Sequence, residues 1–278
     1  MMMGEWAPNE IVICALVGSH AYGMDTPDSD RDFLGVYKED LEVLLGHSSP
    51  MQTHTNTGDD KPKSIPDWTY HEFGKFVSLA IKANPTILEL LWLPKDLYVE
   101  ISPLGELLIE NREIFLSKRV ADSFGKYAHD QAKRLERREG TFSSDTSKRT
   151  AKHARHCFRL LRQGAQLIQT GTMDVKVPNP EELFALGEKP WEKIVEQFSE
   201  EYMRFQRLDN ILPDEPDYES IDRLLVDARI GHLLSEIEGL GNQKDNLKDL
   251  LRTLFRMQGG HLNEFGFSAI QKRVAEGL

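Results

Sequence analysis

Residues 11–33 read IVICALVGSHAYGMDTPDSDRDF and predict a strand, a tight turn and a second strand. The first seven residues are an unbroken apolar run rich in β-branched side chains, which is typical of a strand buried on both faces. The run stops at Gly18-Ser19, and a polar segment rich in Gly and Asp follows it. A second apolar run at 33–37, FLGVY, predicts the next strand. The two strands are therefore joined by a segment that carries Gly, Ser and several carboxylates.

Two carboxylates, Asp30 and Asp32, stand where the chain enters the second strand. Side chains alternate along a strand, so we expect Asp30 and Asp32 to lie on one face. Glycine at position 18 lets the backbone approach a ligand closely, and the amides after it can point at phosphate oxygens. Paired carboxylates beside such a turn favour a site that holds Mg²⁺ or Mn²⁺ between the protein and a nucleoside triphosphate.

The same acidic segment also resembles a calcium-binding loop, with Asp28 at the first position. The sixth position of such a loop is glycine, because the chain turns sharply there. Here the sixth position is Phe33, which begins a strand-like run. We therefore reject the calcium loop.

The chain beyond these strands changes from mixed to wholly helical patterns. Residues 46–64 are polar and predict a surface loop, and residues 65–68 predict a short third strand. The four residues from Thr69 to Glu72 have the form of a capping box, and apolar residues at helical spacing follow them. Asn84-Pro85 predicts the start of another helix. Further helices are expected near 103–115, 118–139, 146–170, 190–207, 218–238 and 244–257.

This order of elements predicts an α+β protein with two domains. Strands and helices alternate in residues 1–100, and residues 101–278 carry helical patterns alone. A chain of 278 residues is long enough for two domains of ordinary size. We therefore expect a first domain of residues 1–100 and an α-helical domain of residues 101–278.

The composition is that of a soluble globular protein, with 40% hydrophobic and 28% charged residues. The longest apolar run is far shorter than the roughly 20 residues that a membrane-spanning helix needs. The N-terminus lacks the pattern of a secretory signal, and the only cysteines are Cys14 and Cys157. Two cysteines do not form a disulfide framework. We therefore expect a cytoplasmic protein that has no membrane partner.

A strongly basic segment lies within this acidic chain. The net charge is −11, yet residues 118–162 hold thirteen Lys or Arg and five Asp or Glu, a local net charge of +8. A basic segment on an acidic body indicates a local anionic ligand, either a triphosphate or a stretch of RNA or DNA. The alternative is a pair of solvated helices whose charges bind nothing specific.

One polar stripe of the helix expected near 146–170 includes Lys152, His156 and Arg159. If this helix faces the Asp30 and Asp32 carboxylates, the stripe would bind the triphosphate and favour release of pyrophosphate. A solvated helix face is an equally good interpretation. Glu89, which lies among leucines, fits a core-edge glutamate paired with a basic residue at least as well as a site residue.

The motif GSHAYG…PDSDRDF is similar to that of polymerase-β-like nucleotidyltransferases: a strand, Gly-Ser, about ten residues and Asp-x-Asp. It most resembles the predicted nucleotidyltransferases of the RNA-repair-pathway, polymerase-β-like family of bacteria and phages. NPTILELLW at 84–92 is similar to the NP-x-x-LE-x-L block of that family. KHARHCFRLLRQG at 152–164 is similar to its K-x-x-x-H-x-x-R-LL-x-x-G block. The resemblance spans roughly residues 11–187.

The resemblance implies a small mixed-sheet nucleotidyltransferase domain that is followed by an α-helical domain. Gly18 and Ser19 would then hold phosphates, and Asp30 and Asp32 would hold the metal ions. The superfamily places a third carboxylate on a later strand, as a metal ligand or general base. Our candidate for that carboxylate is Asp67, and its rivals are Asp59, Asp60 and Glu72.

The implied reaction is metal-dependent attack of an acceptor hydroxyl on the α-phosphate of a nucleoside triphosphate. An RNA or tRNA 3′ end fits both the family and the basic segment. A protein hydroxyl, as in AMP-transferring relatives, or a small molecule, as in aminoglycoside-modifying relatives, fits the same chemistry. The rival class is a non-catalytic nucleotide- or RNA-binding module with the same fold, which loss of the third carboxylate would favour.

Overall fold

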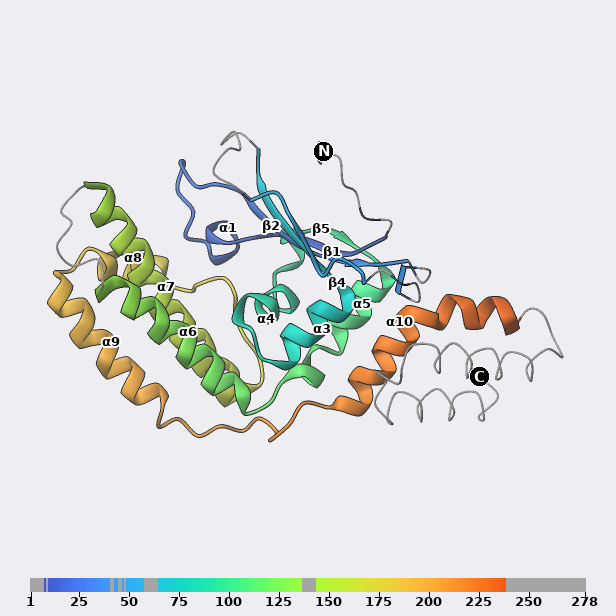
Figure 1. Cartoon of the computed structure of the whole chain (residues 1–278). Coiled ribbons are helices and arrows are strands. Elements are labelled where there is room, and N and C mark those ends of the chain that lie inside the picture. Colours follow the sequence, from blue (N-terminus) through green and yellow to red (C-terminus); the bar gives the residue numbers. More distant parts are fainter. Residues whose placement is uncertain are drawn as a thin grey trace.

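The computed structural model of the chain describes residues 8, 10–40, 43–44, 47, 49–57, 65–136 and 144–238. These residues form one sheet and a series of helices (Figure 1). In chain order the elements are β1 (Glu10–Val17), α1 (Ser19–Tyr22), β2 (Asp32–Lys38), β3 (Thr53–Thr55), β4 (Asp67–Glu72), α3 (Phe73–Ile81), α4 (Pro85–Leu91), η1 (Lys95–Leu97), β5 (Tyr98–Ile101), α5 (Pro103–Glu110), η2 (Arg112–Phe115), α6 (Arg119–Glu136), α7 (Ser144–Thr170), α8 (Pro180–Gly187), α9 (Trp191–Phe205) and α10 (Tyr218–Glu238).

The five strands form a mixed sheet in the order β3-β4-β2-β1-β5. β1 runs antiparallel to both β2 and β5, and β3 runs antiparallel to β4. β2 and β4 are parallel, so their first residues lie at the same end of the sheet. The α+β class predicted from the sequence is confirmed.

The main core lies between the sheet and α3, α4 and α5, which Figure 1 shows together on one face of the sheet. Strand residues such as Val12 and Val36 are fully buried against helical residues such as Phe76. A smaller cluster on the opposite face contains the buried side chains of Cys14, Tyr37 and Tyr70.

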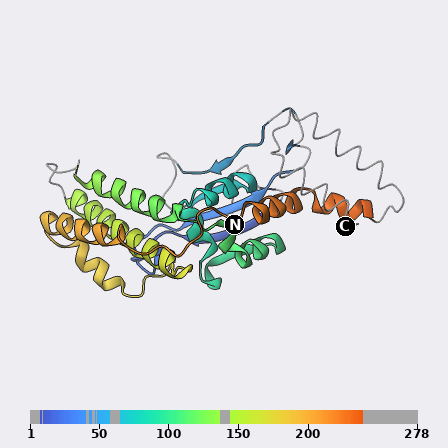
Figure 2. The same ribbon diagram turned by 90° about the horizontal axis from the view of Figure 1, so that it is seen from below.

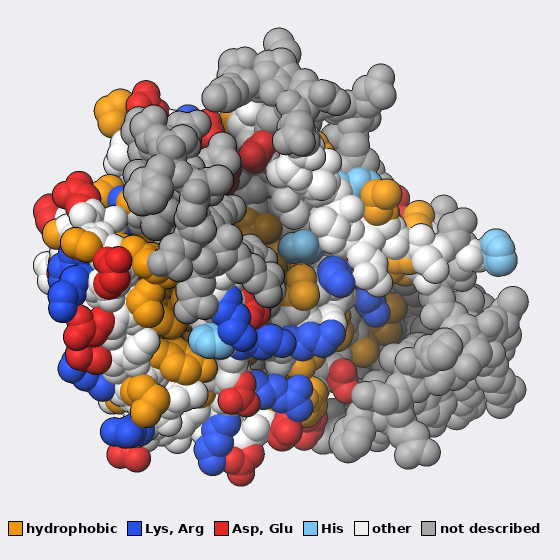
Figure 3. Space-filling view, turned by 60° about the vertical axis from the view of Figure 1, so that its left-hand side comes forward, with side chains coloured by type: hydrophobic (Ala, Val, Ile, Leu, Met, Phe, Trp, Pro, Cys, Tyr) orange, Lys and Arg blue, Asp and Glu red, His pale blue; other side chains and the backbone are white. Residues whose placement is uncertain are grey.

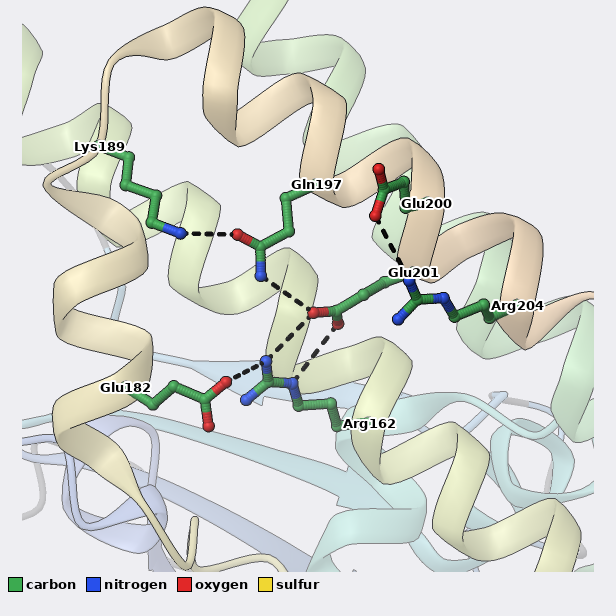
Figure 4. Close-up of polar contacts among 7 residues, drawn as sticks. All are labelled: Arg162, Glu182, Lys189, Gln197, Glu200, Glu201 and Arg204. Carbon is green, nitrogen blue, oxygen red and sulfur yellow. Dashed lines mark hydrogen bonds and ion pairs between the residues drawn. The ribbon is translucent and has the colours of Figure 1, made fainter.

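A second group of helices, α6, α7, α8 and α9, lies beyond one end of the sheet (Figures 1 and 2). A polar network holds α8 and α9 against α7, as Figure 4 shows. The guanidinium of Arg162 on α7 donates to Glu182 on α8 at 2.8 Å and to Glu201 on α9 at 3.2 Å. Gln197 joins the same network, because it donates to Glu201 and accepts from Lys189. These bonds set the orientation of the three helices.

The strand predictions at 11–17 and 33–37 are confirmed by β1 and β2. The helix predicted to begin at Asn84-Pro85 is also confirmed, because the Asn84 side chain accepts a hydrogen bond from the Ile87 amide. The capping box at Thr69 was wrong: residues 67–72 are the strand β4, and Glu72 itself caps α3 by accepting from the Lys75 amide. The predicted third strand therefore extends to Glu72.

The helices predicted over 118–139, 146–170, 190–207 and 218–238 correspond to α6, α7, α9 and α10. The segment predicted as helix near 103–115 is two pieces, α5 and η2. The predicted loop at 46–64 contains a strand, β3, at Thr53–Thr55. The helix predicted near 244–257 lies outside the described residues. The division into domains at residue 100 stays a prediction.

Within the described ranges, none of the helices combines the length and the hydropathy that a membrane span requires.

Candidate active site

The turn after β1 requires glycine at position 18 for two reasons. Gly18 has φ of 69° and ψ of −146°, and such a positive φ strains a residue that has a side chain. A Cβ at this position would also lie only 2.8 Å from the carboxylate oxygen Oδ2 of Asp32. The backbone of the Gly18-Ser19 turn therefore packs directly beside a predicted metal-binding carboxylate.

Asp32 and Asp67 are the first residues of β2 and β4, and they are paired in the parallel register. The sheet thus brings together two carboxylates that are far apart in the sequence. Both side chains are half-buried, whereas Asp30 is exposed in the segment that precedes β2. The rival Glu72 lies at the opposite end of β4, and Asp59 and Asp60 lie outside the described residues.

The predicted acidic residues act on one another electrostatically. Burial raises the pKa of Asp32 above its ordinary value, and the neighbouring charges of Asp67 and Asp30 raise it further. The charges of Lys152 and His20 act on Asp32 in the opposite direction. The charges of four residues thus act on Asp32, and the five residues come from three regions of the sequence. A bound cation would relieve the repulsion between the carboxylates.

Asp32 and Asp67 alone are fewer donors than a complete metal coordination sphere requires. Across the described part of the chain, no group of three or more His, Cys, Asp or Glu side chains is arranged to hold a metal ion. Mg²⁺ commonly takes only one or two protein carboxylates, because phosphate oxygens and water complete its octahedral sphere. Asp32 and Asp67 fit that kind of shared site. Both offer carboxylate oxygens, and the charge of Asp67 raises the pKa of Asp32, so a cation between them would be stabilising.

The polar stripe predicted on α7 divides into two parts. Lys152 is exposed, and its charge acts on Asp32. Arg159 is only 2% exposed, and its guanidinium is paired with Glu89 and Gln163. Its Nη2 also lies 3.0 Å from Nδ1 of His156. Of these three residues of the stripe, only Lys152 has a charge that acts on Asp32; the other two lie in a buried network.

This buried network connects α1, α4 and α7. The Tyr22 hydroxyl on α1 donates to Glu89 on α4 at 2.8 Å, and the Arg159 guanidinium lies 3.5 Å from the centre of the Tyr22 ring. Burial, and then the charge of Arg159, lowers the pKa of His156 to about 3, so its ring is neutral at pH 7. Burial also raises the pKa of Tyr22. The network holds α1, and with it the Gly18-Ser19 turn, against α7.

Two residues near the turn were not assigned a role from the sequence. His20 directs Nδ1 to Oδ2 of Asp25 at 3.4 Å, while its Nε2 is buried and has no hydrogen-bond partner. The stem of Lys176 packs on Gly23, where an added Cβ would lie 3.2 Å from Cε of the lysine. The position of His20 inside the motif was a usable signal. No signal in the sequence indicated Lys176, because only folding brings this residue close to α1.

Residues 5–227 match the model of a family described as the RNA repair pathway DNA polymerase beta family. An uncharacterised 38.9 kDa protein in the nrdC-mobD intergenic region of Enterobacteria phage T4 is 28% identical over 126 residues. The match covers 44% of this chain and 37% of the phage protein, so the chain spans little more than a third of that relative. A nucleotidyltransferase-like protein from Exiguobacterium sibiricum has a crystal structure that matches at 10% identity and a TM-score of 0.30, over 71% of this chain and 69% of its own.

Proposed function

The chain belongs to the RNA repair pathway DNA polymerase beta family, and we propose that it transfers a nucleoside monophosphate from a nucleoside triphosphate to an acceptor hydroxyl. The observation that carries this proposal is the pairing of Asp32 with Asp67 beside the Gly18-Ser19 turn. Carboxylates next to a backbone turn that can approach phosphates are the groups that nucleotidyl transfer requires. If Asp67 is the third carboxylate, its place beside Asp32 favours catalysis over a module that only binds nucleotides.

A divalent cation, Mg²⁺ or Mn²⁺, would be held by Asp32 and Asp67 together with the triphosphate, and the exposed Asp30 would add negative charge beside it. When bound it would stabilise the attacking and leaving oxygens of an in-line displacement. Asp32 is the central ligand in this proposal, because it lies between the Gly18 backbone and Asp67.

The protein groups around the metal site then bind the phosphates and accept the proton of the acceptor. The Gly18-Ser19 turn holds phosphate oxygens, and Lys152 supplies positive charge that acts on Asp32. An acceptor oxygen forms a bond to the α-phosphorus, the bond to the bridging oxygen breaks, and its electron pair leaves with pyrophosphate. Asp67, the third carboxylate, takes the acceptor proton or completes the metal ligands. His20 lies beside the turn, and its buried Nε2 has no hydrogen-bond partner in the free protein.

The proposed acceptor is the 3′ hydroxyl of an RNA or tRNA. The basic segment 118–162 supports this choice, because it carries a local net charge of +8 on an acidic protein. On the side of the molecule where α6–α9 lie, Figure 3 shows Lys and Arg side chains gathered in a band beside a hydrophobic patch. A polyanion fits such a surface better than a neutral small molecule does.

The test is transfer of label from each α-³²P nucleoside triphosphate to RNA with Mg²⁺ or Mn²⁺. RNA with a free 3′ hydroxyl should gain label, whereas the same RNA with a 3′ phosphate should not. Asp32→Asn and Asp67→Asn should each abolish transfer, and Lys193→Ala, which removes an exposed lysine of α9, should not. Label on protein but not on RNA would redirect the proposal to a protein acceptor. No label with any acceptor would refute it.

A further inference from the structure

A cavity of about 260 Å³ lies between α6, α7 and α9, on the side of α7 that faces away from the sheet. Its floor is apolar and buried and includes Ala154, Cys157 and Phe158 of α7. Lys152, two residues before Ala154, acts on Asp32 instead. One helix therefore separates this cavity from the candidate active site, a thickness of about 10–12 Å.

The wall of the cavity is a series of aromatic rings. Phe198 and Tyr202 of α9 are stacked with centroids 5.8 Å apart, and the ring of His129 on α6 stacks on Tyr202 at 5.5 Å. Trp191 lines the same space and is half-buried. Tyr202 already stacks on two rings of the protein, so a further planar group would stack on the half-buried rings of His129 or Trp191.

The lining of the cavity includes polar groups for which the described part of the chain shows no hydrogen-bond or ion-pair partner. These are the Tyr202 hydroxyl, the His129 ring nitrogens and the exposed ammonium of Lys133. An apolar helix laid over the mouth would bury these groups without hydrogen bonds, at a cost of about 1–3 kcal/mol each. A ligand with its own polar edge and a negative charge avoids that cost.

We infer that this cavity binds one unpaired base of a single-stranded nucleic acid. Its volume lies below the about 300–1,000 Å³ of pockets that enclose a drug-sized ligand, and so favours a single ring system. The aromatic wall stacks the base, the Tyr202 and His129 polar atoms contact the base edge, and Lys133 binds a backbone phosphate. Recognition by stacking tolerates any base, so affinity and not sequence choice is the expected contribution.

The position of the cavity suits it to anchor an acceptor strand. A strand held there would pass around α7 toward the carboxylates, so the cavity would anchor an acceptor some nucleotides before its end. That use rests on the proposed function, but binding of the base does not. The cavity is therefore tested by binding alone, without nucleoside triphosphate or metal.

The experiment measures binding of a short fluorescein-labelled oligoadenylate by anisotropy in EDTA. Tyr202→Ala should weaken binding about five- to a hundredfold, the loss expected for one stacked base. Lys133→Ala should also weaken it and should lower the slope of log affinity against log salt by about 1. Lys193→Ala removes an equal charge from α9 at a residue outside the cavity and should have little effect.

Two further measurements separate the cavity from a general basic surface. Ala132→Phe fills the space without removing a contact group and should weaken binding as much as Tyr202→Ala does, with an unchanged melting temperature. Oligoadenylate should quench the fluorescence of Trp191, and Trp191→Phe should remove that quenching. The same measurements with a DNA and an RNA oligonucleotide show whether the sugar affects the binding affinity.

Equal binding by wild type, Tyr202→Ala and Ala132→Phe would overturn the inference, as would absence of any binding to wild type. Oligoadenylate binding by a wild-type protein that transfers no label to any acceptor would refute the proposed reaction and leave the base site standing.

Discussion

Asp32 and Asp67 lie side by side as the first residues of two parallel, hydrogen-bonded strands. The folded chain holds these carboxylates together and partly buries Asp32, which raises the pKa of Asp32. A raised pKa means that the folded state binds this proton more tightly than the unfolded state does. The free energy of unfolding therefore decreases as the pH rises above the ordinary value of 3.8.

From this we predict that Asp32→Asn stabilises the metal-free protein at pH 7 and abolishes activity. The expected gain is about 1 kcal/mol, or about 2–4 °C in melting temperature. The gain should shrink as the pH is lowered toward 4, because the wild-type carboxyl then becomes protonated. Thermal melts of both proteins in EDTA across this pH range measure the effect. A destabilised variant at pH 7 would contradict the repulsion between the carboxylates.

Gly18→Ala should impair the site by steric contact with Asp32. The new methyl group would lie 2.8 Å from Oδ2 of Asp32, so the carboxylate has to move. Gly171→Ala is a matched control, because Gly171 has a similar positive φ of 72° but nothing within 4 Å of an added Cβ. Both variants should lose about 1 kcal/mol of stability from backbone strain. Only Gly18→Ala should also lose label transfer, by at least tenfold; equal activity of the two variants would contradict the contact.

Lys152→Ala should reduce activity without loss of stability, whereas Arg159→Ala should reduce stability. Lys152 is exposed, so its loss should leave the melting temperature unchanged and reduce nucleotide use about tenfold or more. Loss of Arg159 leaves Glu89 buried without its partner and should cost about 3–5 kcal/mol of stability. Chemical denaturation measures the stability of both variants, and label-transfer kinetics measure their use of nucleotide. A stable Arg159→Ala protein with a weakened affinity for nucleotide would place that guanidinium among the phosphate ligands instead.

His20→Gln tests the unpartnered nitrogen beside the turn. Nε2 of His20 is buried without a hydrogen bond, so its replacement should cost the free protein little. If His20 contacts the bound nucleotide, titration calorimetry with Ca²⁺ and a nucleoside triphosphate should give about tenfold weaker binding. Asp25→Asn, which alters the partner of Nδ1, should give a smaller loss. Unchanged affinity in His20→Gln would assign the residue to packing.

The strands and the turn between them could be predicted because their signals are local. An apolar run predicts β1, and alternation along β2 places Asp32 on a definite face. Asp67 could be nominated from the superfamily pattern, but its pairing with Asp32 depends on the register of two parallel strands. Register between strands so far apart in the chain is set by tertiary packing, and no local pattern contains it.

The role of Arg159 could not be read from helical spacing. A basic stripe on an amphipathic helix has the same pattern whether it faces solvent, a phosphate or a buried carboxylate. Glu89, on a different helix, decides the matter by pairing with Arg159. The capping-box error has a related cause: hydrogen bonding to β2 and β3 keeps Thr69 in a strand, which overrides its local preference to start a helix.

The Tyr22, Glu89, Arg159 and Gln163 network has a consequence for how the chain is made on the ribosome. Its members come from three segments, and the last of them is synthesised long after the motif at residues 18–32. Until α7 has emerged, the ring of Tyr22 and the carboxylate of Glu89 lack the guanidinium that contacts both of them. The contacts that join α1 and α4 to α7 can therefore form only after residue 159 has been synthesised.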